Sequence, residues 1–490
     1  MSKPKIMLFF PKPTRLAKNI IPLSLLAIAR MINTQKYDVK LVNATTDHNY
    51  KKKIVRYGRE AICVGISCLT GTQIHDALDV ATLIKQEYPS TPIIWGGWHP
   101  SLLPEQTVLH PCVDIVVKGQ GERTFKQVVY HLSNELPLDN IKGIAYKKND
   151  SVFNNPNRAF EDINNFPRMP YSMIDVEKYV SKYKYGSRCI SYVSSQGCPY
   201  ACGFCCEPIV CGRQWFGLNA KRVVDELEYL HNSYAIDTFK IGDSNFFVSK
   251  TRVKDICMRI IKRKLDINLV SVNGRVELGR WNDDMWNLMR KAGVRELLIG
   301  AESGFQQVLD LIGKNVTVKD TMVCTKKCVK HDIAIRLSFM IGLPTVNTRI
   351  ETEKTIQLID NIWRIHEDAT FLLFFYTPYP NSRLYEISVN CGFSPPRTLD
   401  GWQNFGLHDF KANWVPKKYA RLVRQFNLAI FPYITSNVDF NKTNILKRVA
   451  TKFLEKVARF RWEHKFFGLP IEYKIIKHHL MSKKPLRQTK

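Results

Sequence analysis

The sequence alternates short apolar segments with amphipathic ones, and it does so in two separate series. The first series, within residues 1–145, contains the strand-like segments KIMLFF, DVKLV, AICVGIS, PIIWGG and DIVVKG. Strands that alternate with helices form parallel sheets with helices on both faces, and ligands bind beyond the carboxyl ends of the strands. We therefore predict an α/β protein that begins with a doubly wound, Rossmann-like domain.

The second series lies within residues 184–396 and has six strand-like segments, which are CISYVSS, TFKIGD, NLVSVNG, ELLIGAE, IRLSFMIG and TFLLFFYTP. Asn219 and Asn282 precede two of the intervening helices as N-cap candidates, and Gly293 follows the second of these helices as a stop signal. Six strand–helix units predict a complete or partial β/α barrel, with its site on the loops that follow the strands.

Two further regions differ from both series. Residues 146–183 are rich in Asn and Pro and show no sustained period, so they are predicted to be a linker. Residues 397–490 are predicted to be a basic helical C-terminal region. Lys and Arg alternate there with the aromatic residues Phe453, Phe460, Trp462, Phe466 and Phe467.

The composition limits the class of protein. A chain of 490 residues with 45% hydrophobic and 24% charged residues is a folded globular protein and not a disordered or fibrous one. The start of the chain has no pattern of a signal peptide, and no apolar run reaches the roughly 20 residues of a bilayer span. Together with 13 cysteines, these features predict a cytoplasmic protein with reduced thiols. The net charge of +28 attracts anionic partners without choosing among them.

A CxxxCxxC motif follows the first strand of the second series. Its members are Cys198, Cys202 and Cys205. Three thiolates on one loop can ligate three irons of a 4Fe-4S cluster and leave the fourth iron open. The alternative is a zinc knuckle in which Cys206 or Cys211 supplies the fourth sulfur. Zinc loops usually pair two CxxC arms, and no second arm follows, so we favour the open cluster.

This motif, placed after the first of six βα units, resembles the radical S-adenosylmethionine (SAM) superfamily over roughly residues 184–396. The resemblance implies that the open iron chelates the amino and carboxylate groups of SAM. The reduced cluster would then cleave SAM to a 5′-deoxyadenosyl radical.

The same resemblance implies SAM-binding positions at the ends of the strands. Phe204 would pack near the adenine, Gly242 and Asp243 would hold the amino group, and Gly342 would approach the adenine edge. Polar groups that would meet the ribose and methionine are Ser271, Asn273, Arg275, Glu302 and Ser303. The alternative for these polar residues is that they only cap helices.

Three loops of the first series together resemble the cobalamin-binding domain of cobalamin-dependent radical SAM enzymes. Their candidate cobalamin contacts are Ser67, Thr70, Gly96, Gly97, His99, Gly119, Gly121 and Glu122. Glycine lets the backbone approach a bulky ligand, and hydroxyl groups can bind a nucleotide tail. The Asp-x-His-x-x-Gly motif for the lower cobalt ligand is missing. His99 is thus either a replacement ligand or a structural residue, and a degenerate, empty domain is a further alternative.

The resemblance implies a methyltransferase that uses the adenosyl radical and methylcobalamin to methylate an unactivated carbon. The architecture is also similar to that of the anaerobic Mg-protoporphyrin monomethyl ester cyclase and the hopanoid methylases, so cyclisation or oxidation without methyl transfer is an alternative. A tRNA-modifying radical SAM enzyme would explain the positive charge, but the cobalamin-like first domain argues against it. A zinc-bearing RNA-binding or scaffold protein is the non-enzymatic alternative.

The expected partners follow from the same resemblance and from the C-terminal region. A radical SAM enzyme requires an external electron donor of the flavodoxin or ferredoxin type. Basic helices with interleaved aromatic residues can lie on the inner face of a membrane and present a lipid or another hydrophobic substrate. Alternatively, the charges are solvated helix faces and the aromatic residues pack against the barrel. Nucleic acid is the less favoured partner.

Overall fold

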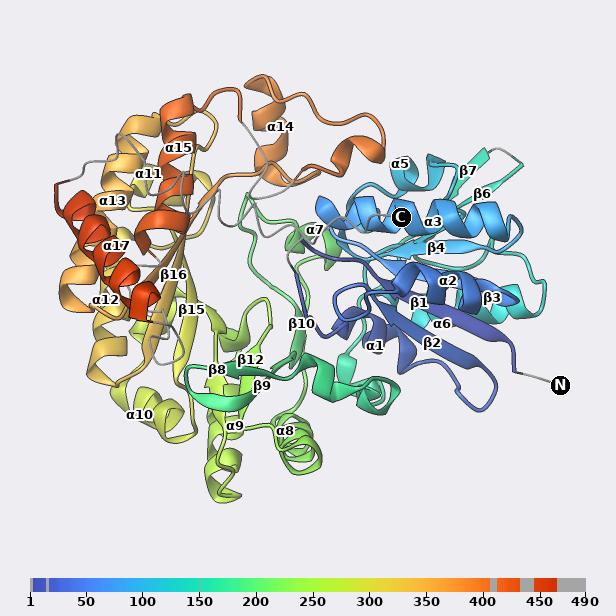
Figure 1. The fold of residues 1–490 in the computed structure, drawn as a ribbon, viewed down its shortest axis with the longest axis horizontal. Coiled ribbons are helices and arrows are strands. Elements are labelled where there is room, and N and C mark those ends of the chain that lie inside the picture. The colour runs from blue at the N-terminus through green and yellow to red at the C-terminus, as the bar shows by residue number, and fades with distance from the viewer. Residues whose placement is uncertain (1–2, 15–16, 150, 406–411, 432–444, 465–490) are drawn as a thin grey trace.

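The structure is a computed structural model that describes residues 3–14, 17–149, 151–405, 412–431 and 445–464. It consists of two α/β bodies that lie side by side, the first in blue and the second in green to orange (Figure 1). The fold class predicted from the sequence is confirmed, because each series of strands forms its own parallel arrangement.

The first body is built on a seven-stranded sheet of order β2-β1-β3-β4-β5-β6-β7. The five predicted strands are parallel to one another: β1 (Lys5–Phe10), β2 (Asp38–Asn43), β3 (Ala61–Ser67), β4 (Ile93–Gly96) and β5 (Ile115–Val117). Two further strands that were not predicted, β6 (Ile144–Lys148) and β7 (Ser151–Asn154), extend one edge in antiparallel pairing.

Both faces of this sheet are covered by helices. Successive side chains of a strand point to opposite faces, so Ile6 and Leu8 of β1 belong to one apolar core and Met7 and Phe9 to another. The first core lies under α1 (Leu23–Ala29) and α6 (Gly121–Ser133), and the second under α2 (Tyr50–Gly58) and α3 (Thr72–Glu87). Two short helices, α4 (Trp98–Leu102) and α5 (Pro104–Leu109), follow β4.

The second body is a partial barrel whose six parallel segments are the six predicted ones. Their bounds are β9 (Gly186–Tyr192), β12 (Thr238–Ile241), β13 (Asn268–Val270) with β14 (Val272–Arg275), β15 (Glu296–Glu302), β16 (Ala334–Ile341) and β17 (Thr370–Phe375). The third segment is divided at Ser271, whose φ of +50° turns the chain so that β13 pairs with β12 and β14 pairs with β15. A short strand, β8 (Ser181–Tyr183), joins β9 from the other side.

Helices follow the barrel strands: α8 (Ala220–Tyr234), α9 (Lys250–Lys262), α10 (Asp283–Lys291), α11 (Gln306–Leu311), α12 (Val318–Lys330), α13 (Thr348–Ile365) and α14 (Arg383–Asn390). The side chain of Asn219 caps α8 by accepting a hydrogen bond from the backbone of Arg222 at 2.9 Å. Asn282 occupies the N-cap position of α10 without a side-chain capping bond. Gly293, with a φ of +94°, ends α10 as predicted.

The segment between the two bodies is packed against the barrel. It contains the 3-10 helices η1 (Ile163–Asn165), η2 (Tyr171–Met173) and η3 (Val176–Tyr179). Ile163, Phe166 and Tyr171 are buried in the barrel core. The period of a regular helix or strand is absent there, but the apolar residues still anchor the chain.

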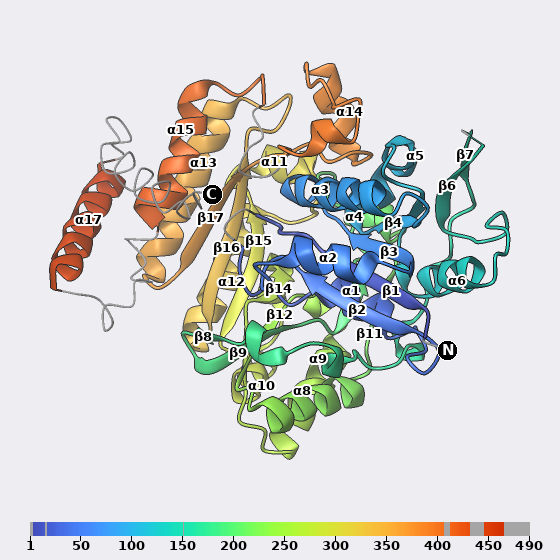
Figure 2. The same cartoon turned by 45° about the vertical axis from the view of Figure 1, so that its right-hand side comes forward.

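The C-terminal region divides between the two bodies. Phe393, Leu399, Trp402 and Phe405, around η6 (Asp400–Trp402), join the apolar core of the first sheet. Beyond them, α15 (Lys417–Gln425), the π-helix η7 (Phe426–Ile430) and α17 (Ile445–Glu463) continue the chain. Both views place α17 on the side of the barrel away from the first sheet (Figures 1 and 2).

The aromatic residues of α17 have different surroundings. Trp462 is buried, and its ring contacts Trp363, Phe426 and Phe431. Phe453 and Phe460 are exposed, whereas Phe466 and Phe467 lie outside the described residues. Among the helices that the structure describes, none combines the length and apolarity needed to cross a bilayer.

Candidate functional site

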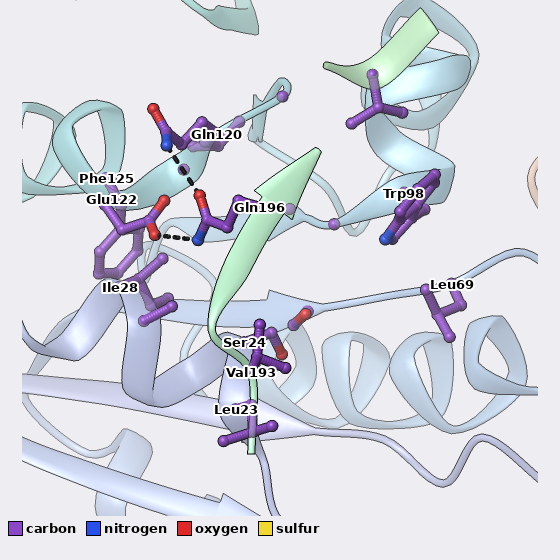
Figure 3. A pocket seen from close by; sticks show the side chains of 18 of the residues that line it. Leu23, Ser24, Ile28, Leu69, Trp98, Gln120, Glu122, Phe125, Val193 and Gln196 are labelled. Atoms are coloured by element: carbon purple, nitrogen blue, oxygen red, sulfur yellow. Dashed lines mark hydrogen bonds between the residues drawn. The ribbon is translucent and has the colours of Figure 1, made fainter. Parts of the chain in front are cut away.

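A cavity of about 530 Å³ lies between the carboxyl ends of the first sheet and the beginning of the barrel. Figure 3 shows its walls. Apolar side chains dominate, including Ile28, Trp98 and Phe125 from the first body, and Val193, Gln196 and Gly242 come from the second. The cavity is thus a shared site at the position where a doubly wound sheet binds its ligand.

Six of the eight candidate cobalamin residues line this cavity: Ser67, Gly96, Gly97, Gly119, Gly121 and Glu122. Gly97 has a φ of +99°, and a Cβ atom there would lie 2.6 Å from the carbonyl oxygen of Cys68. Only glycine therefore fits where β4 passes the end of β3. These open, glycine-rich loops suit a large ligand that is held mainly by shape.

The other two candidates, Thr70 and His99, are not in the cavity wall. The His99 ring is buried beside Trp402, with 5.7 Å between ring centroids, and its Nδ1 lies 3.1 Å from the Thr70 hydroxyl. Burial lowers the pKa of His99 to about 3, so the imidazole is neutral. This position favours the structural alternative for His99 over cobalt ligation.

The cysteine loop is held at both of its ends. Before it, β10 (Ser195–Gly197) pairs with β11 (Trp215–Gly217), and after it comes the short helix α7 (Glu207–Val210). In the middle, the Gly203 amide donates to the carbonyl of Ile312 at 2.7 Å, and the Gly203 carbonyl accepts from the amide of Leu384 at 2.9 Å. The barrel therefore fixes the backbone between Cys202 and Cys205.

Electrostatic interactions link the three thiols of the loop. Burial raises the pKa of Cys198 and places that of Cys205 well above its usual range, and the Cys202 sulfur adds to the rise in both. Within the described ranges, no three His, Cys, Asp or Glu side chains gather around one point that would hold a single ion. A 4Fe-4S cluster does not require such a point, because each cysteine binds a different iron. A donor set of three thiols on one loop fits that cluster.

Asp243 holds the chain just before the cysteines. Its side chain is fully buried, and its carboxylate accepts hydrogen bonds of 2.6 Å from the Ser194 amide, the Ser194 hydroxyl and the Ser195 hydroxyl. Arg252 donates to the Ser194 carbonyl and hydroxyl, and Asn273 donates to the Asp243 carbonyl. The carboxylate predicted to meet SAM is thus already bonded to the loop.

The other predicted SAM positions also bond mainly to protein groups. Glu302 forms an ion pair with the buried Lys314, and the buried Ser303 hydroxyl accepts from the amide of Phe305. Phe204 packs at the margin of the barrel core, and Ser271 occupies the break between β13 and β14.

Gly342 has a φ of +82°, and both of its backbone polar groups are bonded. Its amide donates to Glu351 at 2.8 Å, and its carbonyl accepts from the Trp414 indole at 2.9 Å. Gly242 differs from these positions because it lies in the cavity wall.

A polar bridge that no sequence pattern predicted crosses the cavity wall. Gln120 donates to Gln196 at 2.8 Å, and Gln196 donates to Glu122 at 2.7 Å (Figure 3). Glu122 is paired with Arg30 at 2.7 Å, and both side chains are almost fully buried. Gln196 could have been selected as a site residue because it lies two residues before Cys198, whereas no sequence feature marks Arg30. The bridge connects the first body directly to the cysteine loop.

The comparisons with known proteins agree with this geometry. Residues 14–129 match the B12 binding domain, and residues 192–359 match the radical SAM superfamily. An uncharacterised methyltransferase of Pyrococcus horikoshii is 30% identical over 396 residues, which are 79% of this chain and 83% of that protein. The anaerobic magnesium-protoporphyrin IX monomethyl ester cyclase of Synechocystis sp. is 23% identical over 75% of this chain and 72% of the cyclase.

A solved structure shows the same fold. The cobalamin-dependent S-adenosylmethionine radical enzyme OxsB superposes with a TM-score of 0.75 at 16% identity, over 98% of this chain and 75% of that one. The chain is a radical SAM enzyme. It belongs to the members of this superfamily that carry a B12-binding domain before the barrel, which confirms the family resemblance of its motifs.

Proposed function

We propose that this protein uses a 4Fe-4S cluster, SAM and cobalamin to methylate an unactivated carbon of its substrate. The observation that carries the proposal is the shared cavity, whose wall contains the glycine-rich strand ends of the first body and Gln196 and Gly197, which precede Cys198. This arrangement brings a candidate cobalamin site and a candidate cluster site to one space.

The residues have distinct roles in this proposal. Cys198, Cys202 and Cys205 hold the cluster, and Gly96, Gly97, Gly119 and Gly121 admit the corrin. When these groups are bound, they supply a 5′-deoxyadenosyl radical and a transferable methyl group. The apolar cavity wall excludes water from a reactive carbon radical. The bonds of Asp243 to Ser194 and Ser195 hold the cluster loop toward the cavity.

The predicted SAM contacts remain part of the proposal. Gly242 fits it most directly, because it lies in the cavity wall, and Phe204 belongs to the cysteine loop itself. Ser271, Glu302, Ser303 and Gly342 would shape the barrel side of the SAM site through the protein groups they already bind. Asp243 would act by positioning the loop.

The test is anaerobic reconstitution with iron, sulfide, cobalamin, SAM and a reductant. A methyltransferase of this kind consumes one SAM for the methyl group and one for the radical, so 5′-deoxyadenosine and S-adenosylhomocysteine should both form. Omission of cobalamin should abolish the second product and spare the first. If neither product forms with an intact cluster, the proposal is wrong.

A second reaction is favoured by one observation, the similarity to the cyclase of Synechocystis. Cyclisation or oxidation without methyl transfer would give 5′-deoxyadenosine without S-adenosylhomocysteine. The same product analysis therefore separates the two reactions.

We further propose a hydrophobic substrate, an external electron donor of the flavodoxin or ferredoxin type, and contact with the inner face of the membrane. The apolar cavity supports the first. On α17, the exposed Phe453 and Phe460 with the exposed Lys452 and Lys456 support membrane contact. Anionic vesicles should co-sediment the protein in a salt-sensitive manner, and a Phe453→Ser/Phe460→Ser variant should bind less. Equal binding of both proteins would disprove this contact.

A further inference from the structure

Arg275 does not point an unbonded guanidinium into the barrel, as a ligand for the SAM carboxylate would. It lies at the end of β14, and its side chain is 11% exposed. Its Nη1 atom is 3.2 Å from the Sγ atom of Cys202, and its guanidinium carbon is 3.9 Å from the centre of the Tyr200 ring. Both partners belong to the cysteine loop.

The rest of the guanidinium is fixed by the barrel. Nε and Nη2 donate to Oε1 of Glu277 at 2.9 and 2.6 Å, and Nη2 also donates to the carbonyl of Lys314. Because arginine presents its donors in a rigid planar fork, these bonds aim Nη1 at Cys202. A SAM carboxylate would have to displace Glu277 to form the same two-pronged bond.

A donor in this position changes the chemistry of a cluster ligand. Hydrogen bonds to ligand sulfurs and nearby positive charge favour the reduced form of an iron–sulfur cluster, because reduction adds negative charge. The interaction is strengthened by partial burial, which lowers the local dielectric constant. Stacking of the cation on Tyr200 also holds the stretch between Cys198 and Cys202.

We propose that Arg275 is a positioning residue of the cluster, which donates to the Cys202 sulfur, raises the reduction potential and orients this half of the loop. The proposal rests on the proposed function, because it requires a 4Fe-4S cluster on Cys198, Cys202 and Cys205. It assigns Arg275 to the cluster instead of to SAM.

The experiment measures the midpoint potential of the reconstituted cluster by an EPR-monitored titration without SAM. In Arg275→Gln we expect a more negative potential, with the ratio of reduced to oxidised cluster at a fixed potential falling by about tenfold, which is 59 mV for a one-electron couple. Arg275→Lys keeps the charge but loses the fork, so its potential should lie between those of Arg275→Gln and the unmodified protein.

Arg280→Gln is the matched control. Arg280 lies on the same connection, η5 (Val276–Arg280), and is exposed in an ion pair with Asp320, so its loss should leave the potential unchanged. If Arg275→Gln does not assemble a cluster, Arg275→Lys tests the same point, because it keeps the positive charge but loses the planar fork aimed at Cys202, and its potential should still be more negative than that of the unmodified protein.

Two results would overturn the proposal. One is an unchanged SAM-free potential in Arg275→Gln or Arg275→Lys, combined with weaker SAM binding, which would make Arg275 a SAM ligand. The other is a potential that moves equally in Arg280→Gln. Failure of the unmodified protein to bind iron and sulfide would instead refute the proposed function itself.

Discussion

The two walls of the cavity are built on different principles. The first body contributes strand ends with glycine at four positions and few charged groups. The barrel contributes Gly242 and the residues just before the cysteines to the wall. The charged side chains at its neighbouring strand ends, Asp243 and Arg275, are bonded to the cysteine loop or to the residues that precede it. A large cofactor needs space in the first wall, whereas the second wall must hold a metal-binding loop rigidly.

The type of a residue indicates its role more directly in the first wall than in the barrel. In the first wall the backbone itself forms the site, so a glycine marks it. In the barrel, buried polar groups must find partners, and these partners come from distant parts of the chain. A glycine in the first wall therefore marks a candidate ligand site, whereas a charged residue at the end of a barrel strand bonds to the cysteine loop or to its neighbours.

Loss of a cluster ligand should reduce activity most. Cys205→Ala removes one of three cluster ligands, and we expect loss of the cluster and at least a hundredfold fall in 5′-deoxyadenosine formation. Iron and sulfide analysis with product quantification measures this. Cobalamin binding should persist, and Cys391→Ala, outside the loop, should behave as the unmodified protein. A Cys205→Ala variant that still cleaves SAM would contradict the cluster assignment.

The second strongest effect is expected from a side chain added at Gly97 in the cavity wall of the first body. Gly97→Ala places a Cβ atom 2.6 Å from the Cys68 oxygen at a φ of +99°. We expect a loss of about 1–3 kcal/mol in the free energy of unfolding and weaker cobalamin binding, with the cluster retained. Gly212→Ala is the control, because it shares a positive φ of +59° but has no atom within 4 Å of the added Cβ. Equal effects of both changes on cobalamin absorbance would contradict the close approach.

Asp243→Asn tests whether the Asp243 carboxylate stabilises the segment before the cysteines through its hydrogen bonds. The change weakens hydrogen bonds to Ser194 and Ser195 that now end on a charged group, so about 1–3 kcal/mol of stability should be lost. Denaturant unfolding of the apoprotein, without SAM, measures it. The exposed Asp284→Asn should stay within about 0.5 kcal/mol of the unmodified protein. No loss in Asp243→Asn without SAM would restore Asp243 to a purely SAM-binding role.

The prediction with the weakest effect at neutral pH concerns His99, because its effect develops only as the pH falls below 6.5. Because its pKa falls from 6.5 to about 3 on folding, the unfolded chain binds a proton in this interval that the folded protein does not. Stability should therefore decrease as pH falls from 6.5 toward 3, by up to about 1.4 kcal/mol per pH unit from this group. Unfolding of His99→Gln should show a shallower dependence over that range. Weaker cobalamin binding in this variant would instead favour cobalt ligation.

The sequence predicted the strands because local patterns define them. Alternation of Ile6 and Leu8 with Met7 and Phe9 has the period of a strand, and the spacing of Cys198, Cys202 and Cys205 is also a local feature. Long-range pairs have no such pattern. Arg30 and Glu122 are 92 positions apart, and Gln106 and Trp402 are 296 apart.

The hydrogen-bond partners of the predicted site residues could not be predicted for the same reason. Asp243 accepts hydrogen bonds from Ser194 and Ser195 because β9 and β12 pair side by side. No local sequence period predicts this pairing. The strands β6 and β7 were missed because β6 ends in two lysines and β7 is largely exposed, so neither is the continuous apolar run that marks the buried β4 and β5.

The attachment of Trp402 to the first sheet has a consequence for how the protein is made. Trp402 is fully buried in that sheet's core and donates to Gln106 at 2.7 Å. The ribosome finishes β7 at Asn154 but reaches Phe393 only after some 240 more residues, on the order of ten to fifty seconds later. Throughout that interval the nascent first domain lacks part of its core, so the surface of α3 and Leu103 that η6 covers stays exposed.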